Sequence, residues 1–170
     1  KGLGGGSSSN PGELVGPVID EASAQRIVDW TEEAVAAGAQ LLCGGSRDGT
    51  FVEPTVLRDI PESTPLGCNE AFGPVLGIRT FQTEDEAFEI VNRSRFGLQC
   101  GVFTHDIQVA FRAHRELDVG GVIIGDVPSY RADQMPYGGT KDSGSGREGL
   151  RSAMRDFTEE RVLVLTDLDL

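Results

Sequence analysis

The sequence predicts an α/β domain in which helices flank a mostly parallel sheet. Segments with apolar residues three and four positions apart, which is the period of an α-helix, alternate with short apolar runs of strand length. The connections between them are short, as expected where helices and parallel strands follow one another. With 170 residues, of which 38% are hydrophobic, the chain is long enough for one domain with a buried core.

The composition argues against several classes of partner. The formal net charge of −12 repels phosphate backbones, so we expect no nucleic-acid partner. No apolar run approaches the roughly 20 residues that cross a bilayer, and no basic-then-apolar signal opens the chain. We therefore expect no membrane partner and a cytoplasmic location.

The three cysteines, Cys43, Cys68 and Cys100, are odd in number and widely spaced. This spacing argues against a disulfide framework and against a zinc site. His105 and His114 have no cysteine or histidine neighbours at ligand spacing, so we expect no metal site at all. Free thiols in a reducing compartment are the simplest interpretation.

The first half of the chain alternates between turn-forming and periodic segments. Residues 1–17 are rich in Gly and Ser and predict a lead-in loop. A helix begins near Glu21, and Gly38 is placed to end it in a left-handed conformation. A short buried strand is predicted at 41–43, followed by an extended segment at 51–57 that a proline limits.

Residues 61–74 contain three prolines and two glycines and predict a loop before a strand at 75–81. Thr83 and Glu86 form a capping-box pattern that begins a helix, and Gly97 is placed to end it. The remaining pattern predicts a strand at 98–104, a helix capped by Asp106, a strand at 119–124, a long loop at 126–146, a helix at about 147–157 and a last strand at 162–165.

The segment Gly144–Gly149 matches GxGxxG, the pattern of dinucleotide-binding turns. That function needs a strand directly before the motif and an acidic residue at the end of a second strand about 20 positions later. Here a polar loop precedes the motif and the sequence stops about 20 residues after it. We therefore interpret it as a tight glycine turn that leads into a helix.

Glu70 and Phe72 lie in the loop that enters the strand at 75–81. A carboxylate there can accept two hydrogen bonds from a sugar diol, and a neighbouring aromatic ring can cover a flat heteroaromatic ring. The alternative is a surface glutamate beside a core phenylalanine, and spacing does not decide between the two.

Seven segments, in this order and at these intervals, resemble the aldehyde dehydrogenase superfamily over almost the whole chain. They are 15–19 (VGPVI), 53–57 (EPTVL), 70–75 (EAFGPV), 96–99 (FGLQ), 101–104 (GVFT), 120–122 (GGV) and 136–148 (PYGGTKDSGSGRE). Each is weak alone, but the ordered set is specific. Residues 131–139 (RADQMPYGG) most resemble the glyceraldehyde-3-phosphate and lactaldehyde-like members.

The resemblance implies an enzyme that oxidises a small aldehyde to a carboxylic acid with NAD or NADP, through a thioester on a cysteine. It implies that Glu70 binds the nicotinamide ribose and that Phe72 packs near the nicotinamide. Tyr130 and Tyr137 resemble the wall of the aldehyde tunnel. Arg131 is expected to meet an anionic substrate, although an ordinary surface arginine is the alternative.

The chain also departs from the family pattern. The family nucleophile stands in a GQ-x-C context, which none of the three cysteines has, and the general base lies further upstream. We therefore expect no catalytic residue in this chain and no turnover by it alone. The implied organisation is a lead-in loop at 1–17, a partial catalytic domain at 18–160 and an oligomerisation strand and tail at 161–170, with a homo-oligomer as the assembly.

Two other hypotheses stay open from the sequence. The chain could be a non-catalytic assembly module of the same fold, whose terminal strand pairs with the sheet edge of another chain. It could also be a divergent relative with new chemistry at Cys68 or Cys100, which would require a reactive thiol near neutral pH.

Overall fold

A computed structural model describes residues 15–166 of the chain. These residues form two compact units that divide between Gln82 and Thr83. The α/β class predicted from the sequence is confirmed. The expected parallel pairing is found in two pairs of strands, β4–β5 and β7–β8, and the other pairs among the described residues are antiparallel.

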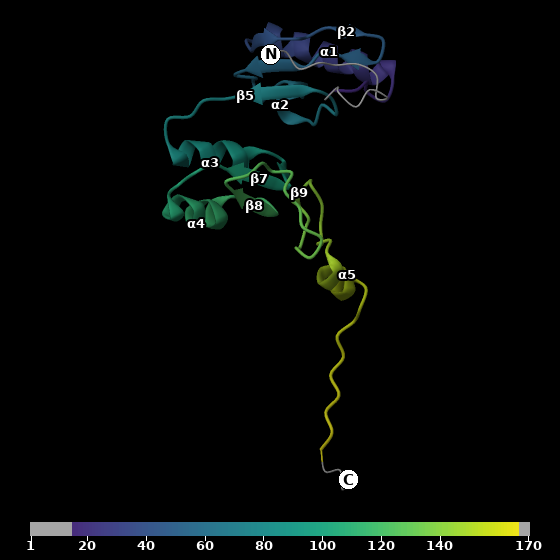
Figure 1. Ribbon diagram of the computed structural model, residues 1–170, viewed down its shortest axis with the longest axis vertical. Helices are drawn as coiled ribbons and strands as arrows, with labels where there is room; N and C mark the ends of the chain where they lie inside the picture. The colour runs from purple at the N-terminus through teal and green to yellow at the C-terminus, as the bar shows by residue number, and fades with distance from the viewer. Residues whose placement is uncertain (1–14, 167–170) are drawn as a thin grey trace. The chain divides into compact units, whose positions relative to one another are not determined.

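The first unit contains two helices and two small sheets (Figure 1). Its elements are α1 (Glu21–Ala36), β1 (Gln40–Cys43), β2 (Arg47–Asp48), β3 (Phe51–Val52), β4 (Thr55–Arg58), α2 (Pro65–Cys68) and β5 (Val75–Ile78). The larger sheet has the order β1-β4-β5, with β1 antiparallel and β5 parallel to the central strand. The parallel register places Thr55 opposite Val75, so β4 fixes where β5 begins.

Helix α1 carries the core of this unit. It begins because the Asp20 carboxylate accepts a hydrogen bond from the Ser23 amide at 2.7 Å, and it ends before Gly38, whose φ of 112° confirms the predicted left-handed residue. Ile27 and Leu57 are both fully buried. Burying an aliphatic side chain of this size stabilises the fold by about 1.5–3 kcal/mol.

The second unit packs two helices against a parallel pair of strands (Figure 1). Its elements are α3 (Glu84–Arg93), β6 (Phe96–Gly97), β7 (Gln99–Val102), α4 (Ile107–Glu116), β8 (Gly121–Ile124), β9 (Thr140–Lys141) and α5 (Leu150–Asp156). The core consists of Phe88 from α3 with Ala113 and Leu117 from α4 and its C-terminal end. Val102 and Val122 of the strand pair pack against it.

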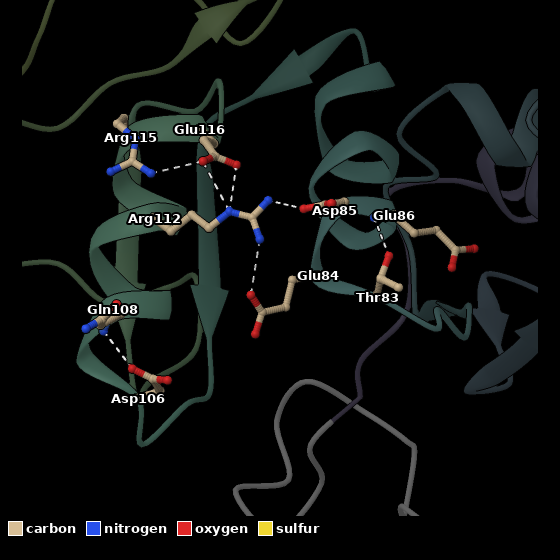
Figure 2. Close-up of polar contacts among 9 residues, drawn as sticks. All are labelled: Thr83, Glu84, Asp85, Glu86, Asp106, Gln108, Arg112, Arg115 and Glu116. Carbon is tan, nitrogen blue, oxygen red and sulfur yellow. Dashed lines mark hydrogen bonds and ion pairs between the residues drawn. The ribbon is translucent and has the colours of Figure 1, made fainter.

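Two predicted caps begin the helices of this unit, as Figure 2 shows. The Thr83 hydroxyl accepts a hydrogen bond from the Glu86 amide at 3.2 Å, and the Asp106 carboxylate accepts one from the Gln108 amide at 2.8 Å. Each cap satisfies a backbone donor that the first turn of a helix leaves without a partner. Both helices therefore start where the sequence predicted.

Arg112 of α4 ties that helix to α3 (Figure 2). Its Nε donates to the Glu116 carboxylate at 3.0 Å, its Nη1 to Glu84 at 3.3 Å, and its Nη2 to Asp85. The guanidinium also lies 5.0 Å from the centre of the Phe88 ring. Because two of its partners lie on α3 and one on its own helix, Arg112 fixes the packing of the two helices.

Several local predictions were wrong. Strand β1 forms where predicted, but it is exposed rather than buried, with Leu41 at 43% and Leu42 at 51% exposure. The segment predicted as a loop at 61–74 contains the single-turn helix α2, which Thr64 caps. Gly97 does not end α3; that helix ends at Arg93, and Gly97 lies in β6, where its backbone pairs with β9.

The predicted strand at 162–165 does not form. The described residues after α5 have no regular secondary structure (Figure 1). Their large apolar side chains are exposed. A strand needs a partner for its backbone donors and acceptors, and this segment has none within the part of the chain that the structure describes.

No helix among the described residues is long and apolar enough to cross a membrane.

Candidate functional site

The loop that carries Glu70 and Phe72 is held at both ends by the first unit. Arg26 of α1 donates from Nη2 to the Ala71 carbonyl at 2.9 Å, and the Thr55 amide donates to the Pro74 carbonyl at 2.9 Å. Gly73 packs so closely on α1 that an added Cβ would lie 2.4 Å from Cδ1 of Ile27. A side chain at this position would therefore have to displace the end of the buried Ile27 side chain, and with the two hydrogen bonds this contact defines the path of the loop against α1.

On this fixed loop, Phe72 has a strained backbone and an exposed ring. Its φ is 52°, in the left-handed region that bulky residues rarely adopt, and its side chain is 74% exposed. The alternative of a core phenylalanine is therefore wrong. The neighbouring Glu70 is also exposed. Strain of this kind persists only where the surrounding structure imposes it, and it is typical of ligand-contacting loops.

The long loop of the second unit brings Arg131 and Tyr137 together and adds Glu148. Arg131 donates from Nη2 to the Glu148 carboxylate at 2.7 Å, and its guanidinium carbon lies 4.6 Å from the centre of the Tyr137 ring. The backbones of Tyr137 and Glu148 pair as an antiparallel bridge, with N···O distances of 3.1 and 2.6 Å. An ion pair, a ring contact and a backbone bridge thus define one cluster.

Tyr130 stands at the beginning of the same loop. The side-chain amide of Gln99 in β7 donates to the Tyr130 carbonyl at 3.1 Å and to the Pro128 carbonyl at 2.7 Å. The Tyr130 side chain is 48% exposed. The backbone of this turn is therefore anchored to the sheet, while the ring stays accessible.

Residues 1–163 match the sequence pattern of the aldehyde dehydrogenase family. The chain belongs to the aldehyde dehydrogenase family. It covers about a third of the length of the family members that it resembles.

Three family members illustrate the similarity. The 3-sulfolactaldehyde dehydrogenase of Priestia aryabhattai is 45% identical over 151 residues, which are 89% of this chain and 32% of that enzyme. Aldehyde dehydrogenase 21 from Physcomitrella patens, solved with the reaction product succinate, superposes with a TM-score of 0.94 at 44% identity, over 98% of this chain and 35% of that one. Glyceraldehyde-3-phosphate dehydrogenase from Methanocaldococcus jannaschii, solved with NADP, gives a TM-score of 0.84 at 36% identity, over 91% and 33%.

None of the three thiols lies in the sequence context of the family nucleophile. Cys43 and Cys68 are exposed, and Cys100 is partly buried beside the core of the second unit. Burial raises the pKa of the Cys100 thiol above its ordinary value, which lowers its thiolate fraction at neutral pH. The raised pKa argues against the alternative of new chemistry at Cys100.

Sequence reasoning assigned no role to Gln99 or Glu148, although both lie in segments that resemble the family. Gln99 anchors the Tyr130 turn and Glu148 pairs with Arg131. Arg147-Glu148 directly follows a glycine turn, and Gly144, Gly146 and Gly149 all have positive φ. The predicted glycine turn before a helix is thus confirmed. The position of Glu148, an acidic residue at the end of this turn, was the sequence feature that could have marked it as a candidate site residue.

Proposed function

We propose that this chain is the C-terminal part of the catalytic region of an NAD(P)-dependent aldehyde dehydrogenase. The whole enzyme would convert an aldehyde to a carboxylic acid through a thioester, with the nucleophilic cysteine and the general base supplied by residues outside this chain. The observation that carries the proposal is Phe72: a strained, exposed aromatic residue on a loop that α1 and β4 hold in place.

The residues of this loop fit a nicotinamide nucleotide. The exposed Glu70 carboxylate can accept hydrogen bonds from both hydroxyls of a ribose, and the exposed Phe72 ring offers a flat apolar face for the nicotinamide. When bound, the cofactor accepts hydride. The proposed role of the two side chains is to bind and orient the cofactor. Because NAD and NADP have the same nicotinamide ribose, this part of the site does not distinguish between them.

The proposed substrate is a small aldehyde with an anionic group. Arg131 has one ion-pair partner among residues 15–166, so most of its guanidinium donors face no described acceptor. Tyr130 and Tyr137 offer aromatic surface for the rest of the molecule. Succinate, 3-sulfolactaldehyde and glyceraldehyde 3-phosphate, which are named for three relatives, each carry an anionic group, whereas lactaldehyde and betaine aldehyde, which are named for others, do not carry a carboxylate, sulfonate or phosphate.

A chimaera tests the cofactor role. The matching third of the Priestia aryabhattai enzyme is replaced by this chain, and NAD(P)-dependent oxidation of 3-sulfolactaldehyde is measured. We expect activity in the chimaera and none in the 170-residue chain alone.

In the chimaera, Glu70→Gln should raise the KM for the cofactor about tenfold, because hydrogen bonds to a charged group contribute about 1.5–3 kcal/mol. Glu89→Gln, at an exposed glutamate on α3, is the matched control.

Turnover by the isolated chain would contradict the absence of a catalytic residue. An unchanged cofactor KM in Glu70→Gln would contradict the role of that carboxylate.

A second role, assembly, is supported by the segment after α5. Val162, Leu163 and Val164 are 90%, 81% and 73% exposed, and a run of apolar residues of this kind is typical of strands that pair with another chain. The proposed state is a homo-oligomer in the cytoplasm, where the three free thiols fit a reducing environment. Light scattering tests it: a monomer at micromolar concentration would contradict the assembly role of this segment.

A further inference from the structure

Glu148 contacts Arg131 at a point that can fix the orientation of its guanidinium. Its carboxylate accepts one hydrogen bond from Nη2 of Arg131 at 2.7 Å, on the guanidinium that lies 4.6 Å from the centre of the Tyr137 ring. A guanidinium has five donors in a rigid plane. Among residues 15–166, none accepts a hydrogen bond from Nε or Nη1 of Arg131. One edge of the guanidinium is therefore bound by Glu148, and the donors on its other edge have no acceptor among these residues.

Glu148 is itself fixed by the backbone. Its amide donates to the Tyr137 carbonyl at 2.6 Å, and its carbonyl accepts from the Tyr137 amide at 3.1 Å. The preceding residue, Arg147, donates from Nη1 to the Gly139 carbonyl at 2.9 Å. The Glu148 carboxylate and the Tyr137 ring, which both contact Arg131, thus belong to two segments that are joined to each other. The three side chains therefore form one cluster.

We propose that Glu148 is a positioning residue: it holds the Arg131 guanidinium against the Tyr137 ring so that its open edge is presented to a small carboxylate, sulfonate or phosphate group. This inference rests on the proposed function, which gives Arg131 an anionic ligand. It assigns Glu148 no contact with that ligand. A long arginine side chain without such support would have to lose rotamer freedom on binding, which weakens the affinity.

The alternative is that Glu148 competes with the anion for Arg131. The two roles predict opposite effects of truncation. If Glu148 positions Arg131, Glu148→Ala weakens anion binding by about two- to tenfold, because ordering one flexible side chain costs about 0.5–1.5 kcal/mol. If Glu148 competes, Glu148→Ala tightens binding. Glu148→Gln keeps an acceptor oxygen at the same reach, so the positioning role predicts that it binds at least as tightly as the unmodified chain.

The orientation of Arg131 can be observed directly. Side-chain protons near an aromatic face experience a ring-current shift, so the Arg131 side-chain resonances of the labelled 170-residue chain report on stacking over Tyr137. We expect this shift to disappear in Glu148→Ala and in Tyr137→Leu, and to persist in Glu148→Gln. Succinate is then titrated into each protein, with resonances of the first unit as the control for folding.

The experiments test the positioning role of Glu148 and anion binding by Arg131 separately. A ring-current shift that survives Glu148→Ala overturns the positioning role, and so does tighter succinate binding in that variant. Failure of the unmodified chain to bind succinate overturns the anion-binding part of the proposed function, while the shift still decides whether Glu148 orients Arg131. If Glu148→Ala does not fold, a lost shift or weakened binding in Glu148→Gln overturns the inference.

Discussion

Among the arginines of the second unit that lie over an aromatic ring, Arg112 and Arg131 differ in how many of their donors are used. Arg112 donates to carboxylates of Glu84, Asp85 and Glu116 and lies 5.0 Å from the centre of the Phe88 ring. Arg131 donates to one carboxylate, that of Glu148, and lies 4.6 Å from the centre of the Tyr137 ring. The same side chain therefore serves as a link between helices in one place and presents open donors in the other.

The difference lies in the supporting elements. Arg112 projects from a regular helix, and its partners come from that helix and from α3, so its contacts stabilise packing (Figure 2). Arg131 lies in an irregular loop, and its partners come from the same loop and the glycine turn after it. The satisfied donors of Arg112 fit a structural role, and the open donors of Arg131 fit the binding role proposed for it.

The largest expected effect concerns the rings beneath the arginines. Phe88 is 8% exposed and belongs to the core, so Phe88→Ala should lower the free energy of unfolding by about 3 kcal/mol. Tyr137 is only partly buried, and Tyr137→Ala should lower it by about 1 kcal/mol. Urea unfolding of both variants measures the difference. Equal losses would contradict the distinction between a core ring and a loop ring.

The next effect comes from the arginines themselves. Arg112→Gln leaves three carboxylates without their shared cation, so their mutual repulsion should lower the Tm by a few degrees. Arg131→Gln should change the free energy of unfolding by less than about 0.5 kcal/mol, as is usual for exposed positions. Thermal unfolding by circular dichroism compares the two. A larger loss in Arg131→Gln than in Arg112→Gln would reverse the assignment of roles.

A smaller effect should depend on pH. Hydrogen bonds from Arg112 and then from Arg115 lower the pKa of Glu116 below its ordinary value of 4.5. Because the folded pKa is the lower one, this stabilisation is complete above pH 4.5 and is lost as the pH falls through the folded pKa. The Tm difference between the unmodified chain and Arg112→Gln should therefore shrink in acid. A difference that grows below pH 4.5 would contradict this coupling.

Local chemistry made several elements predictable from sequence. Asp106 and Thr83 cap their helices, and Gly38 follows the end of α1 with positive φ, because each feature depends on neighbouring residues alone. Helix α2 also had local signals, Thr64 before Pro65, but the density of Pro and Gly around it favoured a loop.

Features that depend on distant residues were harder to predict. The exposure of Leu41 and Leu42 cannot be read from an apolar run, because burial depends on what packs against the strand. The Arg131–Glu148 pair joins residues 17 positions apart through a backbone bridge that no local pattern encodes. The roles expected of Glu70 and Phe72 came from the family resemblance, because spacing did not decide them, and the exposure of Phe72 came only from the structure.

The affinity of the chain for succinate, compared between Arg131→Gln and Arg112→Gln, tests most directly whether the two arginines have different roles. We predict that Arg131→Gln weakens binding about tenfold or more, since a hydrogen bond between charged groups contributes about 1.5–3 kcal/mol, whereas folded Arg112→Gln binds as the unmodified chain does. Equal affinities for succinate in the two variants would contradict this prediction.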